Sequence, residues 1–365
     1  MRTLKQILAG ASLAVLMASG AAQAGSDLNE VGALLVYPTI ANFSVLGLNA
    51  TETFVTITNA GPTPVVAHVS YINGQPNGPT EGGYHTQYCY ECDFSIPLTG
   101  NDTETLVVTT TAGGIAIESE DNSLSMSCPW KYGMMVVSLE DALGNTLTDN
   151  VLLGEEVVVD YVTGSAFSLP AIPFQGGDGG NGDRSYSFDD SEYGKMPRIV
   201  AADFLAPKLD QSGLAVLSLF TLGFERQLPP LVDCSVTGFD ARENPFSASF
   251  QFGCWGLADI CAISPEFCHP NLGLYSNNPL IGPDTHGWLQ LNCRVDSDPL
   301  AANGFEAKGG VHGAIIQTQN AGSKMAAGSG TAFNGAAAWA RLLYQSVTTG
   351  DAVTLLLEEP AGGLF

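Results

Sequence analysis

Basic residues are scarce in this chain: 13 Lys and Arg stand against 37 Asp and Glu in 365 residues, so the formal net charge is −24. A surface with such a charge repels nucleic acid and anionic lipid head groups. The composition therefore predicts no nucleic-acid partner, whereas calcium or cationic partners are compatible with it. We interpret the acids, which are scattered along the chain, as a solubility and salt adaptation of an extracellular protein.

Long apolar runs are also missing, and a membrane-spanning helix needs roughly 20 apolar residues. The longest early run belongs to a signal-peptide pattern over residues 1–24. Its basic start, apolar centre and small-residue cleavage site are Arg2 and Lys5, Ile7 to Met17, and Ala22-Gln23-Ala24. We expect a mature chain without a membrane span, secreted to the periplasm or outside the cell. It begins near Gly25 and has a net charge of −26, because two basic residues are removed.

Motifs of common enzymes are missing as well. No His-Glu-x-x-His zinc motif and no Gly-x-Ser-x-Gly nucleophile elbow occurs. His68 and His286 are therefore predicted to be structural. Acid pairs at 118–121, 155–156 and 189–190 could serve a glycosidase only if two carboxylates faced one cleft.

Eight cysteines are present, an even number, and in an exported protein this predicts structural disulfides. Cys89 and Cys92 have the spacing of redox and metal motifs. A redox pair needs a helix after it, which Pro97 and Gly100 oppose, and zinc would need a second pair at similar spacing. Haem attachment would need His where Asp93 stands.

The pairing of the cysteines follows partly from their positions. Three precede residues 174–195 and five follow, so a fully paired chain needs a bridge between the two halves. A hairpin symmetric about Asn244 would bring Cys234 opposite Cys254, and we predict that bridge. The other expectations concern the remaining six cysteines: Cys128 bonds Cys89 or Cys92, two of Cys261, Cys268 and Cys293 bond each other, and the last two are free or bridge the halves.

Residues 174–195 are rich in Gly, Asp and Ser. This composition predicts a flexible linker between a domain at 25–173 and a domain at 196–365, and the linker should be the most mobile stretch. The alternative interpretation is a calcium loop. Its carboxylates would be Asp178, Asp183, Asp189 and Asp190.

Apolar residues alternate with polar ones over many short segments, which predicts an all-β protein of two sandwich domains. At 51–73, two alternating runs flank "NAGPTP", and we expect a β-hairpin there. The run 213–224 is apolar at nearly every position, as in a strand buried on both faces. Residues 334–346 predict a short helix capped at Asn334, because they are rich in Ala.

The hairpin region resembles immunoglobulin-like sandwich modules of bacterial envelope and surface proteins. The resemblance rests on Ile57-Thr58-Asn59-Ala60-Gly61, on Pro64 and on the alternating run that follows. It covers about two dozen residues and implies a sandwich fold and a place at the cell envelope or surface. No Cys…Trp…Cys spacing of antibody domains frames these strands, and the resemblance assigns no functional residue.

These features favour a secreted, non-catalytic structural, adhesive or binding protein whose partner is a protein or polysaccharide. The alternatives are a secreted hydrolase or carbohydrate-active enzyme, and an extracellular filament subunit. Aromatic residues that could stack on sugar rings or pack in a core are Trp130, Tyr132, Trp255, Trp288 and Trp339.

Overall fold

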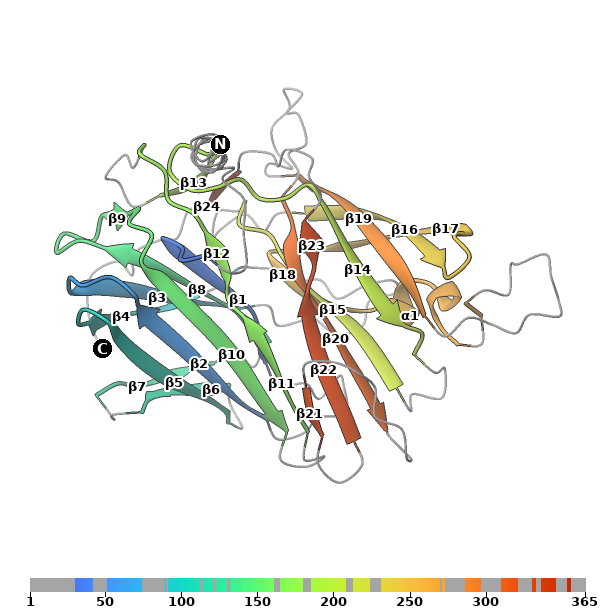
Figure 1. Ribbon diagram of the computed structural model, residues 1–365, viewed down its shortest axis with the longest axis horizontal. Coiled ribbons are helices and arrows are strands. Elements are labelled where there is room, and N and C mark those ends of the chain that lie inside the picture. Colours follow the sequence, from blue (N-terminus) through green and yellow to red (C-terminus); the bar gives the residue numbers. More distant parts are fainter. Residues whose placement is uncertain are drawn as a thin grey trace, which may run out of the picture.

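The computed structural model is an all-β protein built from several antiparallel sheets (Figure 1). Within the part of the chain that it describes, no helix is both long and apolar enough to cross a membrane. The described residues are 30–41, 51–73, 89, 91–111, 114–120, 123–129, 132–160, 165–179, 185–207, 213–223, 231–269, 271–272, 286–296, 310–320, 330–332, 336–345 and 353–355. The predicted signal peptide lies outside these residues.

Two sheets form most of the N-terminal half. The six-stranded sheet has the order β12-β1-β8-β3-β4, with β9 beside β8, and the seven-stranded sheet the order β21-β11-β10-β2-β5-β6-β7. Their strands are β1 (Leu34–Ala41), β2 (Thr51–Asn59), β3 (Val65–Asn73), β4 (Glu91–Leu98), β5 (Asp102–Thr110), β6 (Ile115–Ser119), β7 (Ser125–Cys128), β8 (Tyr132–Glu140), β9 (Thr146–Leu147), β10 (Leu152–Asp160), β11 (Ser165–Pro170), β12 (Ile172–Phe174) and β21 (Gly330–Ala332).

Two further sheets form most of the C-terminal half. The five-stranded sheet has the order β17-β16-β19-β14-β23 and the four-stranded sheet the order β18-β15-β20-β22, while β13 and β24 form a separate pair. The elements are β13 (Tyr186–Phe188), β14 (Ile199–Leu205), β15 (Gly213–Phe220), β16 (Leu231–Asp240), β17 (Pro245–Phe252), β18 (Trp255–Asp259), α1 (Ile260–Ile263), the 3-10 helix η2 (Pro265–Phe267), β19 (His286–Asp296), β20 (His312–Asn320), β22 (Ala336–Leu342), β23 (Tyr344–Gln345) and β24 (Val353–Leu355).

Three hydrophobic clusters lie between these sheets. One separates the seven- and six-stranded sheets and contains Val55 and Met135. A second separates the four- and five-stranded sheets and contains Leu217 and Leu291. The third joins the halves of the chain, since it contains Val136 of the six-stranded sheet and Phe167 of the seven-stranded sheet together with Val216 of the four-stranded sheet. The four-stranded sheet therefore shares a buried cluster with both sheets of the N-terminal half.

Strand β15 is buried on both faces, as its continuous apolar sequence predicts. Val216 and Phe220 belong to the cluster between the halves, whereas Leu217 and Leu219 belong to the cluster of the C-terminal half. The polar exception is Ser218, whose hydroxyl donates a 2.7 Å hydrogen bond to a backbone carbonyl of the other half.

That carbonyl belongs to Pro38, in a bulge of β1. The pairing of β1 with β8 shifts register between Tyr37 and Ile40, because the bulge adds residues to one strand. The freed Pro38 carbonyl also accepts a 2.7 Å bond from the indole Nε1 of Trp255, which is completely buried. The bulge therefore lets the two halves hydrogen-bond inside their shared core, and Trp255 is a core residue.

The expected hairpin at 51–73 is wrong. Strand β2 pairs with β10 and β5, and β3 pairs with β4 and β8, so the two strands lie in different sheets. The Asn59 side chain holds the connection: its amide donates to the carbonyls of Thr63 and Thr99, and its oxygen accepts from the Gly61 amide. Both strands bury their alternate residues against the same cluster from opposite sides, which a hairpin within one sheet would not do.

The expected helix at 334–346 is also wrong where the structure describes it. Residues 336–342 form β22, which pairs with β20 over its whole length. Ala340 and Leu342 are buried in the cluster between the halves. The alternation of inward residues therefore outweighs the helix propensity of alanine, which is only a weak determinant.

Residues 174–195 are more buried than their composition predicts. Phe174, Phe188 and Tyr193 are almost completely buried and their rings contact one another. The Glu192 carboxylate accepts hydrogen bonds from Thr146 and from the Ser187 amide. The segment thus contributes side chains to a core, which its composition did not indicate, while its mobility and the domain boundaries on either side stay predictions.

All eight cysteines are paired. The Cys128 bond to Cys92 and the bond between two of the three later cysteines agree with the sequence prediction. Of the two outcomes that it left open, free cysteines or a bridge between the halves, the structure has the bridge. The predicted Cys234–Cys254 bridge is wrong. The four bonds are Cys89–Cys254, Cys92–Cys128, Cys234–Cys293 and Cys261–Cys268.

The reason for the error is the position of the turn between β16 and β17. Phe239 pairs with Pro245, so the hairpin is centred on Arg242 and Cys234 lies opposite Phe250. The residue opposite Cys234 on its other neighbour, β19, is Cys293. The Cα atoms of this pair are 4.1 Å apart.

Candidate functional site

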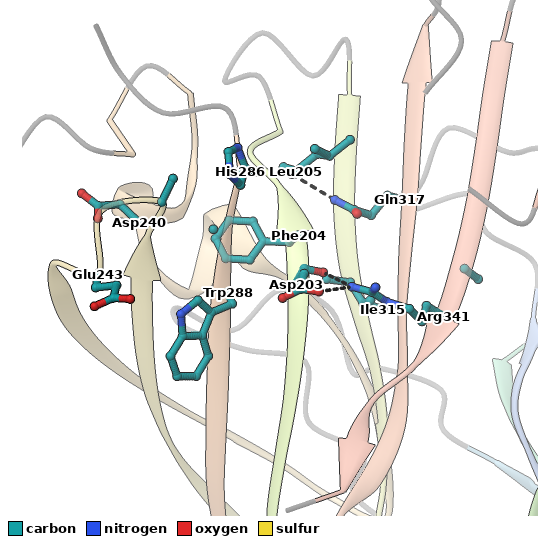
Figure 2. A pocket seen from close by; sticks show the side chains of 13 residues that line it. Asp203, Phe204, Leu205, Asp240, Glu243, His286, Trp288, Ile315, Gln317 and Arg341 are labelled. Atoms are coloured by element: carbon teal, nitrogen blue, oxygen red, sulfur yellow. Dashed lines mark hydrogen bonds and ion pairs between the residues drawn. The ribbon is translucent and has the colours of Figure 1, made fainter. Parts of the chain in front are cut away.

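A cleft of about 550 Å³ opens where β14, β19 and the β16–β17 turn meet β20 and β22 (Figure 2). Its walls combine the aromatic residues Phe204 and Trp288 with polar side chains from all of these elements. A concave site that mixes apolar surface with a few convergent polar groups is the usual form of a small-molecule site. We therefore regard this cleft as the candidate functional site.

An aromatic pair stands at one side of the cleft. Phe239 on β16 and Trp288 on β19 are cross-strand neighbours. Their rings are stacked, with centroids 4.1 Å apart and planes at 9°. Trp288 is 36% exposed, although large aromatic side chains usually become buried. The stacked pair thus presents a rigid aromatic face at the surface.

Two polar side chains close the edge of β14 in the cleft. Arg341 of β22 donates to the backbone carbonyl of Asp203 at 3.0 Å and to its carboxylate at 3.2 Å. Gln317 of β20 donates to the carbonyl of Leu205 at 3.0 Å. Strand β23 pairs with β14 only at Val200 and Ala201, so these side chains replace a neighbouring strand beyond that point.

The Asp240 carboxylate is hydrogen-bonded within the turn beside the cleft. It accepts hydrogen bonds from the amides of Arg242 and Asn244 and from the Asn244 side chain. Burial alone would raise the pKa of Asp240, but these hydrogen bonds to its charged form outweigh burial, so the pKa lies below its ordinary value. Asp240 is an ionised, structural carboxylate.

Glu243 and His286 are the other titratable side chains on this side of the cleft. Glu243 lies in the turn with a φ of 64°, a left-handed conformation that few non-glycine residues adopt. His286 is the first residue of β19 and is exposed. Both line the cleft, and Phe204 lies between His286 and Trp288 in Figure 2. His286 therefore lines the cleft, whereas the sequence predicted a structural role for it.

Among the described residues, the aspartates predicted to bind calcium do not line this cleft. Asp189 accepts hydrogen bonds from the amide and hydroxyl of Ser191, and Asp190 forms an ion pair with Lys195 at 2.6 Å. Asp178 lies in a turn and Asp183 lies outside the described residues. Among the residues that the structure describes, no group of three or more His, Cys, Asp or Glu side chains could hold a metal ion.

The other described residues that the sequence singled out do not line the cleft. Glu155 and Glu156 alternate in β10 and point to opposite faces, so they cannot form a catalytic pair in one cleft. His68 faces Glu140, with Nδ1 3.4 Å from the carboxylate. Tyr132 is partly buried against the cluster between the halves. Trp130 and the side chain of Trp339 lie outside the described residues.

The sequence did not indicate Phe239, Arg341 or Gln317. Phe239 and Trp288 become neighbours only through the register of β16 and β19, across 49 residues of chain. Arg341 reaches Asp203 across a sequence separation of 138. The one available signal was Trp288 itself, which stands in a strand at an outward position.

We expect Gln317→Met to destabilise the protein by about 1–2 kcal/mol, because the Leu205 carbonyl loses its hydrogen bond in a largely buried position. Urea unfolding measures the change. The matched control is Gln290→Met on β19, a half-buried glutamine without a hydrogen-bond partner in the described part of the chain, with an expected change within about 0.5 kcal/mol. Equal effects of the two substitutions would show that Gln317 does not support the β14 edge.

No protein-family model, curated protein or solved structure matches this chain.

Proposed function

We propose that this protein is a secreted, non-catalytic binding protein of the bacterial cell envelope or surface, built from two immunoglobulin-like sandwich modules. Its binding site is the cleft beside Trp288, and its ligand there is a sugar. The observation that carries the proposal is the exposed Trp288 ring, held flat against Phe239 at 4.1 Å. The predicted signal peptide, the four disulfides and the acidic composition support a place outside the cytoplasm.

A sugar suits this cleft because one face of a pyranose ring is apolar and its rim carries hydroxyl groups. The apolar face can lie on Trp288, as aromatic side chains bury large areas in a defined geometry. Asp203 and Glu243 can accept hydrogen bonds from hydroxyl groups, and His286 can donate or accept. Asp203 is held in place by Arg341 and does not need to move to meet a ligand.

A binding role is favoured over hydrolysis by the state of the carboxylates. Asp240 is hydrogen-bonded within the turn and Asp203 is paired with Arg341, whereas a glycosidase needs two carboxyl groups that both reach the scissile bond. The second candidate function is still a carbohydrate-active enzyme. The specific observation in its favour is that Asp203, Glu243 and His286 share one cleft with Trp288.

We expect Trp288→Ala to weaken binding by roughly tenfold or more, because an aromatic side chain that stacks on the ligand contributes a large share of the binding energy. The probes are soluble neutral polysaccharides (a β-glucan, a xylan and a galactomannan), measured by affinity electrophoresis and calorimetry with the intact chain. Leu143→Ala is the control, since Leu143 is an exposed apolar residue outside the cleft.

Two results would contradict the proposal. If none of the polysaccharides bound to the natural chain, the cleft would not be a sugar site. If reducing ends accumulated during incubation and Glu243→Gln abolished them, the protein would be an enzyme.

A further inference from the structure

The peptide between Pro38 and Thr39, in the bulge of β1, is buried between the two halves of the chain. Strand β1 packs against β10 of the N-terminal half and against β15 of the C-terminal half (Figure 1). The Pro38 carbonyl accepts its two hydrogen bonds from Ser218 and Trp255 of the C-terminal half. Because the carbonyl and the N–H of a trans peptide point in opposite directions, the Thr39 amide faces away from these two side chains.

Glu156 of β10 lies on the side of the Thr39 amide. This amide is close enough to lower the pKa of Glu156, although neither carboxyl oxygen has a hydrogen bond of ordinary geometry among the described residues. The Thr39 hydroxyl also lacks a partner among them, and both side chains are completely buried. One peptide therefore connects a poorly satisfied acid in one half with hydrogen-bond donors in the other.

The described groups that face Glu156 from its neighbouring strands carry no charge. Val55 on β2 and Leu169 on β11 are its cross-strand neighbours. The Tyr37 hydroxyl of β1 donates to a backbone carbonyl of β2, and burial raises the pKa of this hydroxyl. His312 of β20 stacks on a ring of the cluster between the halves, and burial lowers its pKa to about 4. Glu156 is thus the group that titrates here between pH 5 and 9.

The two protonation states of Glu156 need different surroundings. Burial raises its pKa to about 8, because an ionised carboxylate needs more hydrogen-bond donors than this site supplies. Water can supply them only if the bulge makes room. The bulge is confined between β10 and the C-terminal half, so that half must draw back and release the hydrogen bonds of Ser218 and Trp255.

We propose that the junction between the two halves is a pH switch, which is closed while Glu156 is protonated and loosens when Glu156 ionises and takes up water beside Thr39. The Cys89–Cys254 disulfide lies in the same buried cluster, so the halves stay linked when the junction loosens. The switch goes beyond the proposed function and does not depend on the ligand of the cleft.

The direction of the switch follows from proton binding. In the closed junction Glu156 keeps its proton up to about pH 8, whereas in the open, hydrated junction it returns to its ordinary pKa of 4.5. Opening therefore releases a proton. The ratio of open to closed molecules should rise roughly tenfold per pH unit between these two values and level off above pH 8.

The test is the rate at which a chemical reductant breaks the Cys89–Cys254 bond, which is buried at the junction. The natural chain and Glu156→Gln, which cannot ionise, are compared from pH 5 to pH 9 with dilute reductant, alkylation and peptide mapping of the intact protein. The ratio of their rates cancels the pH dependence of the reagent itself. It should rise roughly a hundredfold or more from pH 5 to pH 8 and then level off.

Three comparisons assign this effect to the junction. The Cys234–Cys293 bond is buried in the cluster of the C-terminal half, and its rate ratio should stay within about twofold over the same pH range. Glu155→Gln, on the exposed side of β10, should behave like the natural chain. Ser218→Ala removes one donor to the Pro38 carbonyl and should speed reduction of Cys89–Cys254 about fivefold at every pH.

Each opposite result would overturn the inference. A rate ratio that stays constant from pH 5 to pH 9 would mean that the junction does not respond to Glu156. Equal acceleration of the Cys89–Cys254 and Cys234–Cys293 bonds would mean that rising pH unfolds the whole chain. Unchanged reduction in Ser218→Ala would mean that the Pro38 carbonyl does not hold the C-terminal half.

Discussion

Glu156→Gln is expected to raise the stability of the protein at pH 8.5 by about 4 kcal/mol. Glu156 lies in β10 and is completely buried, with Val55 and Leu169 as its cross-strand neighbours. Neither carboxylate oxygen has a hydrogen-bond partner among the described residues. Burial raises the pKa of Glu156 to about 8, and the nearby Thr39 amide offsets this only in part.

The sign of the pH dependence follows from proton binding. Between its ordinary pKa of 4.5 and about 8, the folded protein keeps a proton on Glu156 that the unfolded chain has released. The contribution of Glu156 to stability therefore has its full value below about pH 4.5, falls as the pH rises to about 8, and does not fall further above that. Glutamine cannot ionise, so the variant lacks this decline.

Urea unfolding at pH 5, 6.5 and 8.5 measures the effect. The two proteins should differ little at pH 5 and most at pH 8.5. The control is Glu155→Gln, because Glu155 is the next residue of β10 and points to the exposed face. If Glu156→Gln and the natural chain lost stability in parallel with rising pH, Glu156 would be ionised in the folded protein.

Replacing both Cys89 and Cys254 by alanine should cost about 4–5 kcal/mol of stability. This bond spans 165 residues and joins the two halves within their shared core. A cross-link that closes a long loop removes much of the conformational entropy of the unfolded chain, and its loss restores that entropy. The same double replacement at Cys261 and Cys268, which are 7 residues apart, should cost about 2 kcal/mol.

Chemical denaturation of the two double variants under identical conditions compares these costs. Mass mapping first confirms that the three other bonds form in each variant. Equal losses in the two variants would show that the Cys89–Cys254 bond adds nothing beyond a local link. The shared apolar cluster would then hold the halves together without it.

The alternation along the chain predicted most strands of the structure. Val55 and Ile57 are fully buried with their polar neighbours outward, as the pattern in β2 indicates. The pattern did not predict the partner of β2, because alternate burial is the same in a hairpin and in an arch between two sheets. The turn at Asn59 decides between them through hydrogen bonds to Thr63 and Thr99, the second of which lies 40 residues away.

For the disulfides too, the sequence predicted one part and the tertiary structure decided the rest. The odd numbers of cysteines in the two halves left either a bridge between the halves or two free cysteines, and the structure contains the bridge, Cys89–Cys254. The identity of the partners depended on register. Because the turn is centred on Arg242, Cys254 lies beyond the end of β17 and Cys234 faces Cys293. The number of cysteines does not reveal that the turn is centred two residues before Asn244.

The sequence by itself determined that this chain forms strands and that its cysteines can all pair only if a link joins the halves, because these properties depend on local alternation and on number. Tertiary structure alone decided which strands are neighbours, that Trp255 is buried while Trp288 stays exposed on Phe239, and that Asp203 meets Arg341 across 138 residues. The physical reason is that backbone hydrogen bonds are alike for any pair of strands, so the partners are selected by side-chain packing in the three clusters, which no local segment contains.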